Sequence, residues 1–596
     1  MPIRHRFSAV ASVCLILAHA ASAQESSRFI QPTVKPTGTP SAERRQASHQ
    51  VPANREPASS PREAIPGDGQ TEAFLEYDLE QLGQVVIAAS LAVEVTTVSR
   101  TESTVGKSPA AIFVVSNEMI RRSGARSVPE VLRMVPGVTV QRITSNKWAV
   151  SIRGFNGHRA NKLLVQIDGR DVYTSTFAGT QWDIQDVLLE DVDRIEVIRG
   201  PGATVWGANA MNGVINIITK HSRETQGVFA ETGVGDKWQS FASARYGGQV
   251  GRDLTYRAWG KWFEREASPT AGGFPGPASD AWRMAHGGGQ VDWEPTCCDH
   301  LMFQGAYYDG FSGEFSSFPT FPPIGGRTTV DGSHHLKGSH VLARWTHKID
   351  DEREWSVQTY YDRTERDAVF PALVLGNDRD TIDVDFQYQF PMGPCHQVVC
   401  GFGYRYTDDL IRNTPATSFI PNERPLDRFG YFVQDTMTLI EDRWFFTLGS
   451  KFSHNDYTQF EMQPTARLLW TPNNRTSVWG AVSRAVRTPS RSNTDVIFPL
   501  FPPFVTFFGN PRIESEEVLA YEFGARAQPV EEFFWDAALY YNDYTDLHVA
   551  APVPGGVIAR NSSAHEFTWG GELVSTYELN SCSRARVGYS FFRGDR

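Results

Sequence analysis

The sequence predicts a mostly-β membrane protein, in which a large antiparallel transmembrane β-barrel is preceded by a smaller mixed α/β domain. A chain of 596 residues exceeds one ordinary globular core, so at least two domains are expected. Many segments after residue 222 alternate apolar and polar side chains, a period typical of strands with one lipid-facing and one wet face. The mean hydropathy of -0.35 and the lack of a long apolar run exclude a polytopic helical membrane protein.

The composition and the motifs argue against two other classes of protein. The formal net charge is -11, which disfavours a nucleic-acid partner. The sequence carries no nucleophile elbow, no HExxH zinc motif and no phosphate-binding loop, and the glycines from Gly200 to Gly207 lack the dinucleotide-binding spacing. We therefore expect neither an enzyme nor a bound cofactor, and no metal site.

The first 73 residues are expected to lie outside the folded domains. Residues 1–23 have the parts of a signal peptide: basic residues from Arg4 to Arg6, an apolar run from Phe7 to Ala20, and a small-residue end at Ala21–Ala23. The apolar run is too short to be a membrane anchor. Residues 24–73 are rich in Pro, Ser, Ala, Gln and Arg, cannot bury enough apolar surface to fold, and are predicted to be a disordered linker.

The α/β domain is predicted from short β-branched runs and from helix start and stop signals. A strand at Ile112–Val115 leads into a short helix, for which Ser116 supplies the N-cap and Gly124 the stop. A second helix follows Ser127 and closes at Pro136–Gly137. Further strands are predicted at Val138–Val140, Val150–Arg153, Leu163–Ile167, Val192–Ile198 and Val214–Ile218.

The barrel prediction rests on long alternating segments. Trp355–Asp362, Leu519–Gly524 and Trp535–Asn542 each place apolar and aromatic residues on one face and smaller or polar residues on the other. A soluble β-sandwich is the alternative for any single segment, but it does not explain so many long repeats. The predicted boundaries are a segment at 74–104 that passes from a short helical pattern into extended stretches, the α/β domain at 105–222 and the barrel at 223–596.

Four linked motifs carry a family resemblance over Glu94–Lys220. They are SPAAIFVVSNEMIRRSGARSVPEVLRMVPGV, SIRGFNG, LLVQIDGRDVY and DVDRIEVIRGPGATVWGANAMNGVINIITK. In this order they resemble the plug domain of TonB-dependent outer-membrane receptors, the superfamily of siderophore and cobalamin receptors. The later segments FGYFVQDTMTL, AVSRAVRTPS, GNPRIESEEVLAYEFGAR and LYYNDYTDL resemble the barrel half of the same receptors.

The resemblance implies a plug that fills a barrel of about 22 strands in the outer membrane. It further implies a monomer with an N-terminal tether in the periplasm, and import of a scarce ligand that is driven by TonB. Short connectors, expected to face the periplasm, lie at Pro295–Asp299, Asp350–Glu352 and Glu441–Arg443. Long connectors, expected to face outward, lie near Ala267–Gly287, Gly310–Ser339 and Ser492–Asn510.

The end of the chain departs from the family pattern. About 17 strands can be proposed after the plug, and the sequence stops at GYSFFRGDR. Family members usually end in a strand with a terminal aromatic residue, and Arg596 is not aromatic. Because an open edge inside lipid would leave backbone groups unsatisfied, we expect the barrel to be incomplete at this C-terminus.

TonB is expected to bind a flexible extended segment before the plug by adding it as a strand. The favoured segment is Glu94, Val95, Thr96, Thr97 and Val98, with Val85–Ala88 as second choice. The alternative is that either segment is the first strand of the plug.

A latch between plug and barrel wall is expected from four charged residues. Arg153 and Arg199 lie in the motifs that face acidic wall residues in the family, and Glu522 and Glu572 match those acidic positions. Buried charges need partners, so the four would hold the plug and still be breakable under pulling. The alternative is ordinary surface pairing, which contributes little.

Ligand contacts are expected at the outward tips of the plug and the barrel loops, where aromatic and cationic residues gather. The candidates are Arg142, Trp148, Phe155, Arg159, Tyr173, Trp182, Phe315 and Phe504. Such a mixture suits an aromatic, anionic chelate, although self-packing of the loops is an equal alternative. His334, His335 and His340 are interpreted as solvated loop residues rather than haem ligands.

The predicted function is import of a ferric siderophore or a comparable large nutrient. Cobalamin, haem or oligosaccharide uptake are alternatives by the same mechanism, and a passive porin is disfavoured by the long plug. A surface receptor that binds without import is the alternative from another class. Among the cysteines, Cys395 and Cys400 are candidates for a local bridge, Cys297–Cys298 is a vicinal pair, and the pairing of Cys582 is left open.

Overall fold

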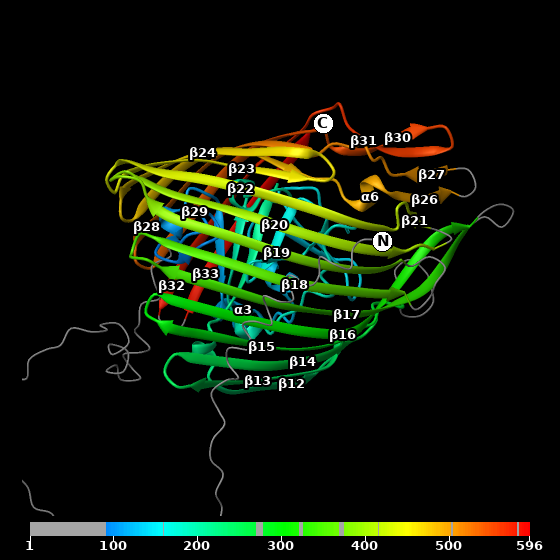
Figure 1. Cartoon of the computed structure of the whole chain (residues 1–596), viewed down its shortest axis with the longest axis horizontal. Coiled ribbons are helices and arrows are strands. Elements are labelled where there is room, and N and C mark those ends of the chain that lie inside the picture. The colour runs from blue at the N-terminus through cyan, green and yellow to red at the C-terminus, as the bar shows by residue number, and fades with distance from the viewer. Residues whose placement is uncertain are drawn as a thin grey trace, which may run out of the picture. The chain divides into compact units, whose positions relative to one another are not determined.

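The structure is a computed structural model. It describes residues 91–158, 160–269, 278–320, 326–368, 375–414, 417–501, 505–580 and 583–595, with the backbone alone at 315–320, 326–330 and 499–501. All of these belong to one compact unit, Tyr77–Arg596, and are drawn as ribbons in Figure 1. The predicted signal peptide, the linker and Val85–Ala88 lie outside the described residues. In the described ranges, no helix has the length and apolar character needed to cross a membrane.

The α/β domain is built on a five-stranded sheet in the order β3-β10-β11-β6-β7. Its strands are β3 (Ile112–Ser116), β10 (Val192–Arg199), β11 (Gly213–Thr219), β6 (Leu163–Ile167) and β7 (Arg170–Asp171). β10 runs antiparallel to β3 and β11, whereas β11 and β6 are parallel. Ile195, Val197 and Ile215 are fully buried, as expected of β-branched residues in a strand covered on both faces.

Short elements surround this sheet. Helix α3 (Asn117–Ser123) is capped as predicted, because the Ser116 hydroxyl accepts a hydrogen bond from the Met119 backbone and Gly124 takes the left-handed conformation. The second predicted helix is α4 (Val128–Val131) followed by η2 (Leu132–Met134). The remaining elements are β1 (Glu94–Val95), β2 (Ser103–Thr104), η1 (Val105–Lys107), β4 (Val138–Arg142), β5 (Trp148–Ile152), β8 (Tyr173–Thr174), β9 (Gly179–Thr180), η3 (Leu189–Asp191), α5 (Ala203–Trp206) and η4 (Ser222–Thr225).

The large sheet has 17 strands in the described residues, each antiparallel to the next, with β12 and β33 at its two edges. The count agrees with the 17 strands proposed from the sequence and is below the 22 that the resemblance implies. The strands are β12 (Gly227–Val234), β13 (Trp238–Val250), β14 (Leu254–Arg265), β15 (Trp282–Thr296), β16 (Asp299–Thr320), β17 (Gly326–Lys348), β18 (Glu354–Ala368), β19 (Gly376–Pro391), β20 (His396–Arg412), β22 (Glu423–Ile440), β23 (Trp444–Asn455), β24 (Gln459–Asn473), β25 (Thr476–Arg487), β28 (Glu516–Val530), β29 (Phe533–Thr545), β32 (Glu566–Asn580) and β33 (Ser583–Asp595).

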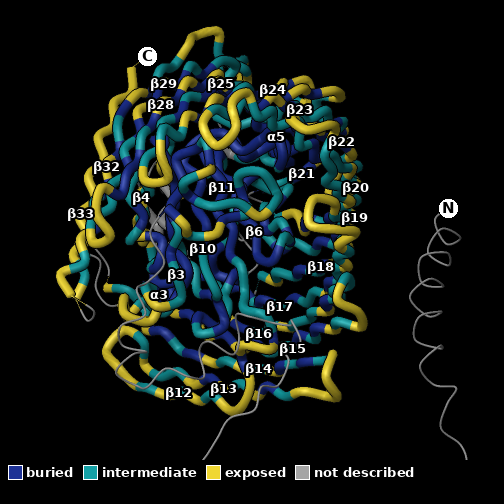
Figure 2. Tube along the Cα trace, turned by 90° about the vertical axis from the view of Figure 1, so that its left-hand side faces the viewer, coloured by how far each residue is buried: buried dark blue, intermediate teal, exposed yellow. Residues whose placement is uncertain are grey.

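The two faces of the large sheet differ as the alternation predicts. On β29, Leu539 is 61% exposed and Tyr541 42%, whereas Asp536 and Tyr540 on the same strand are buried. Figure 2 shows the buried residues gathered around β6, β10 and β11, inside the curve of the large sheet. An apolar outer face and a polar inner face are what a lipid-exposed wall with a polar interior requires.

The predicted long connectors are partly wrong, whereas the three short ones are confirmed as breaks between successive strands. Residues 310–320 and 326–339 are strand rather than loop, because β16 and β17 stay paired from Asp299↔His347 to Thr320↔Gly326. Most of the described residues in 492–510 belong either to helix α6 (Arg491–Thr494) or to two strands of a second five-stranded sheet. Its strands are β21 (Ser418–Phe419), β26 (Val496–Phe501), β27 (Val505–Phe508), β31 (Gly556–Asn561) and β30 (His548–Val553).

The predicted bridge between Cys395 and Cys400 is wrong, because both thiols are free. Cys395 directly precedes β20 and Cys400 lies on it, and five residues of extended strand span roughly 16 Å. A disulfide needs Cα atoms within about 7 Å. Cys297 and Cys298 are free as well, and Cys582 lies outside the described residues.

Candidate functional site

A cavity of about 540 Å³ lies between the α/β domain, the wall strands β16 to β20 and the second five-stranded sheet. We call it the aromatic pocket, after the rings of Trp148, Phe177, Trp182, Phe419, Phe498 and Phe507 that line it. Its volume falls in the range of about 300–1,000 Å³ that is usual for small-molecule sites. Apolar rings around a few polar groups are the common composition of such sites.

The charges in the aromatic pocket neutralise one another. Lys147 forms an ion pair with Glu314, with Nζ and Oε1 3.0 Å apart. Arg366 donates to both carboxylate oxygens of Asp183 at 2.8 Å. The described lining therefore has two cations matched by two carboxylates, and it does not supply the surplus of positive charge that the predicted anionic ligand would need.

Two of the eight predicted ligand residues, Trp148 and Trp182, line the aromatic pocket. Phe155 instead packs edge-to-face on Tyr544 with ring centroids 4.8 Å apart, and Tyr173 donates its hydroxyl hydrogen to the Asn161 carbonyl at 2.9 Å. Arg142 is exposed at the end of β4 and is not among the lining residues. Arg159, Phe504 and the side chain of Phe315 lie outside the described residues.

The sequence reasoning missed part of this lining. Phe177 lies beside the predicted Trp182 in the same plug loop, so its aromatic character was a usable signal. Arg366 lies on wall strand β18 and Phe419 on β21 of the second sheet, so only the fold brings these two residues together. His334 lies on β17 rather than in a loop, which corrects the interpretation of the three histidines as loop residues.

The four residues predicted as a latch lie in one buried cluster between the α/β domain and the wall. Arg153 Nη1 donates to Glu522 Oε1 at 2.7 Å, and Arg153 Nε donates to Glu572 Oε1 at 3.1 Å. Arg199 Nη1 lies 3.0 Å from Glu572 Oε2. All four side chains are at most 3% exposed, so surface pairing is not what the geometry shows.

Two wall residues that the sequence reasoning missed extend this latch cluster. Asp536 lies 3.5 Å from Arg199, and Arg526 lies 3.5 Å from Asp536. Burial disfavours the charged guanidinium of Arg153, but the Glu572 and Glu522 carboxylates outweigh it and hold the pKa of Arg153 above its usual range. Arg153 therefore keeps its positive charge in the buried cluster.

Glycine at position 200 is a requirement of this cluster. Its φ of 132° is a conformation that residues with a side chain rarely adopt, and an added Cβ would lie 2.3 Å from Glu522 Oε1. The Gly-Pro-Gly turn of the sequence thus lets the backbone approach the wall carboxylate.

Comparison with protein-family models identifies both parts of the chain. Residues 299–596 match the model described as "TonB dependent receptor-like, beta-barrel", and residues 104–214 match the "TonB-dependent Receptor Plug Domain". The first match alone spans half of the chain. The chain belongs to the TonB-dependent receptor family. The α/β domain is its plug, the large sheet is its barrel wall, and the family consists of outer-membrane receptors rather than enzymes.

Relatives of known function match a shorter stretch of this TonB-dependent receptor. The vitamin B12 transporter BtuB of Vibrio vulnificus is 33% identical over 151 residues, which are 25% of this chain and 24% of the relative. BtuB of Photobacterium profundum is 33% identical over 170 residues, 28% and 27% of the two chains. The chain thus matches about a quarter of the length of these curated relatives.

Two solved receptor structures share the fold over most of the chain. The siderophore receptor PirA from Pseudomonas aeruginosa has a TM-score of 0.63 at 17% identity, covering 81% of this chain and 85% of that one. The alcaligin outer membrane receptor FauA from Bordetella pertussis has a TM-score of 0.65 at 15% identity, covering 85% and 84%. At these identities the likeness shows the fold alone.

The segment predicted to bind TonB is docked on the plug. Glu94 and Val95 form β1, which pairs with β2, so the predicted flexible segment is a short fixed strand here. The Glu196 carboxylate accepts the backbone N–H of Thr96 at 2.9 Å and that of Thr97 at 2.8 Å, and also the Thr97 hydroxyl at 2.6 Å. We call these contacts the Glu196 clasp.

Two further plug residues fix the same segment. Trp206 Nε1 donates to the Thr97 carbonyl at 2.7 Å, and Asn216 Nδ2 donates to the Thr97 hydroxyl at 3.1 Å. Thr97 is fully buried, whereas Thr96 and Val98 are partly exposed. A partner could add to this strand only after the Glu196 clasp has opened.

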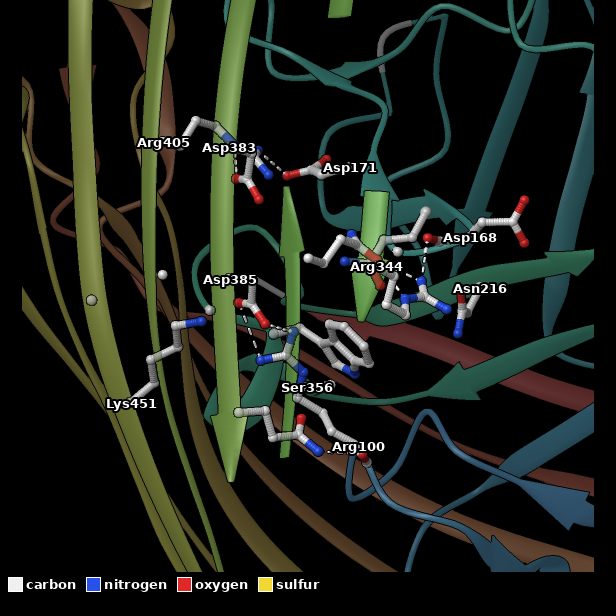
Figure 3. Close-up of a pocket in the computed structure, with 18 of the residues that line it drawn as sticks. Arg100, Asp168, Asp171, Asn216, Arg344, Ser356, Asp383, Asp385, Arg405 and Lys451 are labelled. Atoms are coloured by element: carbon white, nitrogen blue, oxygen red, sulfur yellow. Dashed lines mark hydrogen bonds and ion pairs between the residues drawn. The ribbon is translucent and has the colours of Figure 1, made fainter. Parts of the chain in front are cut away.

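A second cavity, of about 340 Å³, lies beside the clasp between the plug and the wall. Figure 3 shows charged side chains of plug and wall facing one another across it. Arg100 pairs with Asp385 at 2.8 Å, Arg405 bridges Asp383 at 2.8 Å and plug residue Asp171, and Arg344 donates to the Asp168 carbonyl at 2.6 Å. We call it the polar cavity, since ion pairs bridge it from plug to wall.

A third, smaller cavity of about 100 Å³ is lined by residues next to both of the others. It shares Asp171, Arg405 and Arg428 with the polar cavity. Its residues Thr174 and Ser175 directly precede Thr176 and Phe177 of the aromatic pocket. The three cavities therefore follow one plug segment, residues 171–183, along the wall.

Proposed function

We propose that this receptor imports a large, scarce metal chelate across the outer membrane with energy delivered by TonB, and that a ferric siderophore is the favoured ligand. Family membership and the aromatic pocket beside a latched plug support this function. The receptor is proposed to act as a monomer in outer-membrane lipid, with its N-terminal tether in the periplasm. The observation that carries the ligand class is the pocket of about 540 Å³, lined by six aromatic rings and balanced charges.

The composition of the pocket favours a chelate of low net charge. A strongly anionic ferric catecholate would face Lys147 and Arg366, whose charges are already neutralised by Glu314 and Asp183. Breaking either pair to bind an anion would strand a carboxylate in the pocket, which is unfavourable. A nearly neutral chelate can instead stack on Trp148 and Trp182 and leave both ion pairs intact.

A corrinoid is the second candidate ligand. The curated relatives of the matched segment are vitamin B12 transporters, and a large ligand without surplus charge fits the same pocket. Haem, oligosaccharides and binding without import remain alternatives that growth and uptake measurements separate.

Growth of a receptor-deletion strain that expresses this chain tests the ligand class. Each culture would receive one nutrient source: a neutral ferric hydroxamate, an anionic ferric catecholate, cobalamin, haem or an oligosaccharide. We expect growth on the neutral ferric chelate, lost in a Trp148→Ala/Trp182→Ala variant. Growth on the catecholate alone, unaffected by these substitutions, would contradict the proposal.

TonB is proposed to bind Glu94–Val98 after the Glu196 clasp opens. We expect Glu196→Ala to strengthen binding of the periplasmic domain of TonB to the purified receptor, because Thr96 and Thr97 lose their shared acceptor. Glu118→Ala is the matched control, since Glu118 is a plug carboxylate on helix α3 that pairs with Arg122 and not with the clasp. Equal binding by parent and Glu196→Ala would place the TonB contact elsewhere.

The three cavities along residues 171–183 are the proposed route of the ligand past the plug. Along this route several contacts between plug and wall are separate ion pairs, such as Arg170–Asp362 at 2.6 Å and Asp171–Arg405. Charged contacts across a wet interface can be exchanged for water as the plug segment moves, whereas an apolar interface would have to be exposed.

A further inference from the structure

Four side chains with metal-ligating atoms meet where the chain leaves the plug and enters the wall. His221 precedes η4, Asp292 and Glu294 lie near the end of β15, and His300 lies near the start of β16. The ligating atoms of His221, Asp292 and His300 all lie within 4.8 Å of one another. We call these four residues the plug-exit cluster.

The distances converge on Asp292. Its Oδ1 lies 3.0 Å from His300 Nε2 and 3.7 Å from His221 Nε2. Glu294 Oε1 lies 3.7 Å from the same His221 nitrogen. Bonds of about 2.0–2.2 Å to a tetrahedral ion separate neighbouring ligand atoms by roughly 3.4 Å, so small movements of these side chains would complete a coordination shell.

Asp292 is held in place by its other oxygen. Oδ2 accepts the backbone N–H of Ser222 at 2.9 Å and the side-chain amide of Gln290 at 2.9 Å. The carboxylate is 1% exposed, and its Oδ1 is turned toward both imidazoles. Outer hydrogen bonds of this kind orient a metal ligand before the ion arrives.

His221 has one ring nitrogen that lacks a hydrogen-bond partner among the described residues, which is a second indication of a metal site. Its Nε2 is buried, and no described residue forms a hydrogen bond with it, although it faces two carboxylates. A simple His–Asp pair explains His300, but it leaves the orientation of His221 unexplained, since a buried polar atom without a partner is unfavourable.

We propose that the plug-exit cluster is a binding site for one divalent transition-metal ion of the zinc type. His221 Nε2, His300 Nε2 and Asp292 Oδ1 would be its ligands, with Glu294 Oε1 as the fourth. Two imidazoles with two carboxylates are a donor set that suits zinc, and calcium or magnesium would prefer oxygen alone. The proposal does not depend on which ligand the receptor imports.

Metal binding would change the hydrogen bonding of His221. The Arg223 backbone N–H donates to His221 Nδ1 at 3.1 Å, and this contact is solvent-exposed. An ion at Nε2 leaves the ring proton on Nδ1, so this hydrogen bond is released. Glu294 would keep its ion pair with Arg223, because that pair uses Oε2 and the metal would bind Oε1.

The ion would connect the plug exit to the wall. His221 lies on the segment between the last plug strand and β12, whereas the other ligands lie on β15 and β16. Metal binding would thus tie the C-terminal end of the plug to two wall strands, and bound metal should raise the temperature at which the receptor unfolds.

The test is a calorimetric titration of the purified full-length receptor with Zn²⁺. A second titration uses Co²⁺, whose absorption spectrum reports its coordination. A Cys297→Ser/Cys298→Ser background removes the exposed vicinal thiols, which could bind zinc by themselves. In this background we expect one Zn²⁺ ion to bind tightly per receptor. His221→Gln and His300→Gln should each reduce the affinity for Zn²⁺ at least about 100-fold, since loss of a residue that only orients a ligand already costs about 10–100-fold. His396→Gln is the matched control, because the His396 imidazole pairs with Asp435 at 2.7 Å, and this variant should bind zinc as the background does.

Unchanged affinity and stoichiometry in both histidine variants would overturn the proposal. If a variant does not fold, the Co²⁺ spectrum of the unsubstituted site decides the question. An intense four-coordinate ligand-field spectrum supports the site, and the weak spectrum of hydrated Co²⁺ overturns it.

Discussion

Glu572→Gln is expected to loosen the plug by removing the carboxylate that both latch arginines share. In the folded receptor, Glu572 contacts Arg153 at 3.1 Å and Arg199 at 3.0 Å, and its side chain is 1% exposed. After the substitution Arg153 retains Glu522, but Arg199 retains only Asp536 at 3.5 Å. Breaking a buried ion pair costs about 3–5 kcal/mol, and a glutamine that keeps the shape should bring the loss to about 3 kcal/mol.

Native-state hydrogen exchange of the plug strands β10 and β11 measures this loss. A change of about 3 kcal/mol raises the opening equilibrium by roughly two orders of magnitude. Glu517→Gln is the control, because Glu517 pairs with Arg484 on the exposed side of the same wall, where about 1 kcal/mol or less is expected. A Glu572→Gln effect no larger than this control would refute the latch.

Three other substitutions probe the pocket, the glycine turn and the ion pairs between plug and wall. Trp182→Ala should weaken binding of the imported ligand by about tenfold to a hundredfold, because it removes a buried ring from the aromatic pocket. Trp345 is 42% exposed and does not line the pocket, so Trp345→Ala should leave the affinity for the ligand unchanged. Gly200→Ala should destabilise the plug by about 1–3 kcal/mol in chemical unfolding, since its Cβ would meet Glu522; an effect near zero would show that the turn can move away. Burial raises the pKa of Asp171, but Arg405 and Arg428 outweigh it and lower the pKa below its usual range, so the stability that Asp171 contributes is present above about pH 4 and lost as the pH falls through the lowered value. Plug protection factors, which are exchange rates corrected for the intrinsic pH dependence of amide exchange, should therefore be equal at pH 7 and 5 and fall in stronger acid. Asp171→Asn should abolish that fall.

Local patterns in the sequence predicted the elements of the plug and the faces of the wall. The strand at Leu163–Ile167 and the cap at Ser116 depend on neighbouring residues, which a sequence displays directly. The alternation on β29 likewise follows from the period of a strand. Latch residues were found because their motifs resemble those of a family, and the structure brings all four together.

Contacts between distant segments could not be predicted in this way. Glu196 holds Thr96 from 100 positions along the chain, and Asp292 meets His221 across 71 positions. Nothing in the spacing marks such pairs, because the register between plug and wall decides which side chains meet. For the same reason Phe155 was assigned to the ligand, although its ring packs on Tyr544 inside the interface.

Accumulation of ligand by whole cells, compared with ligand bound at the cell surface, tests energy-coupled import most directly. The comparison uses the intact receptor and a variant that lacks Glu94–Val98, each in cells with and without TonB. We predict equal surface binding in all four strains and accumulation only where the intact receptor and TonB are both present. Accumulation that persists without TonB would contradict energy-coupled import, and so would surface binding without accumulation in any strain.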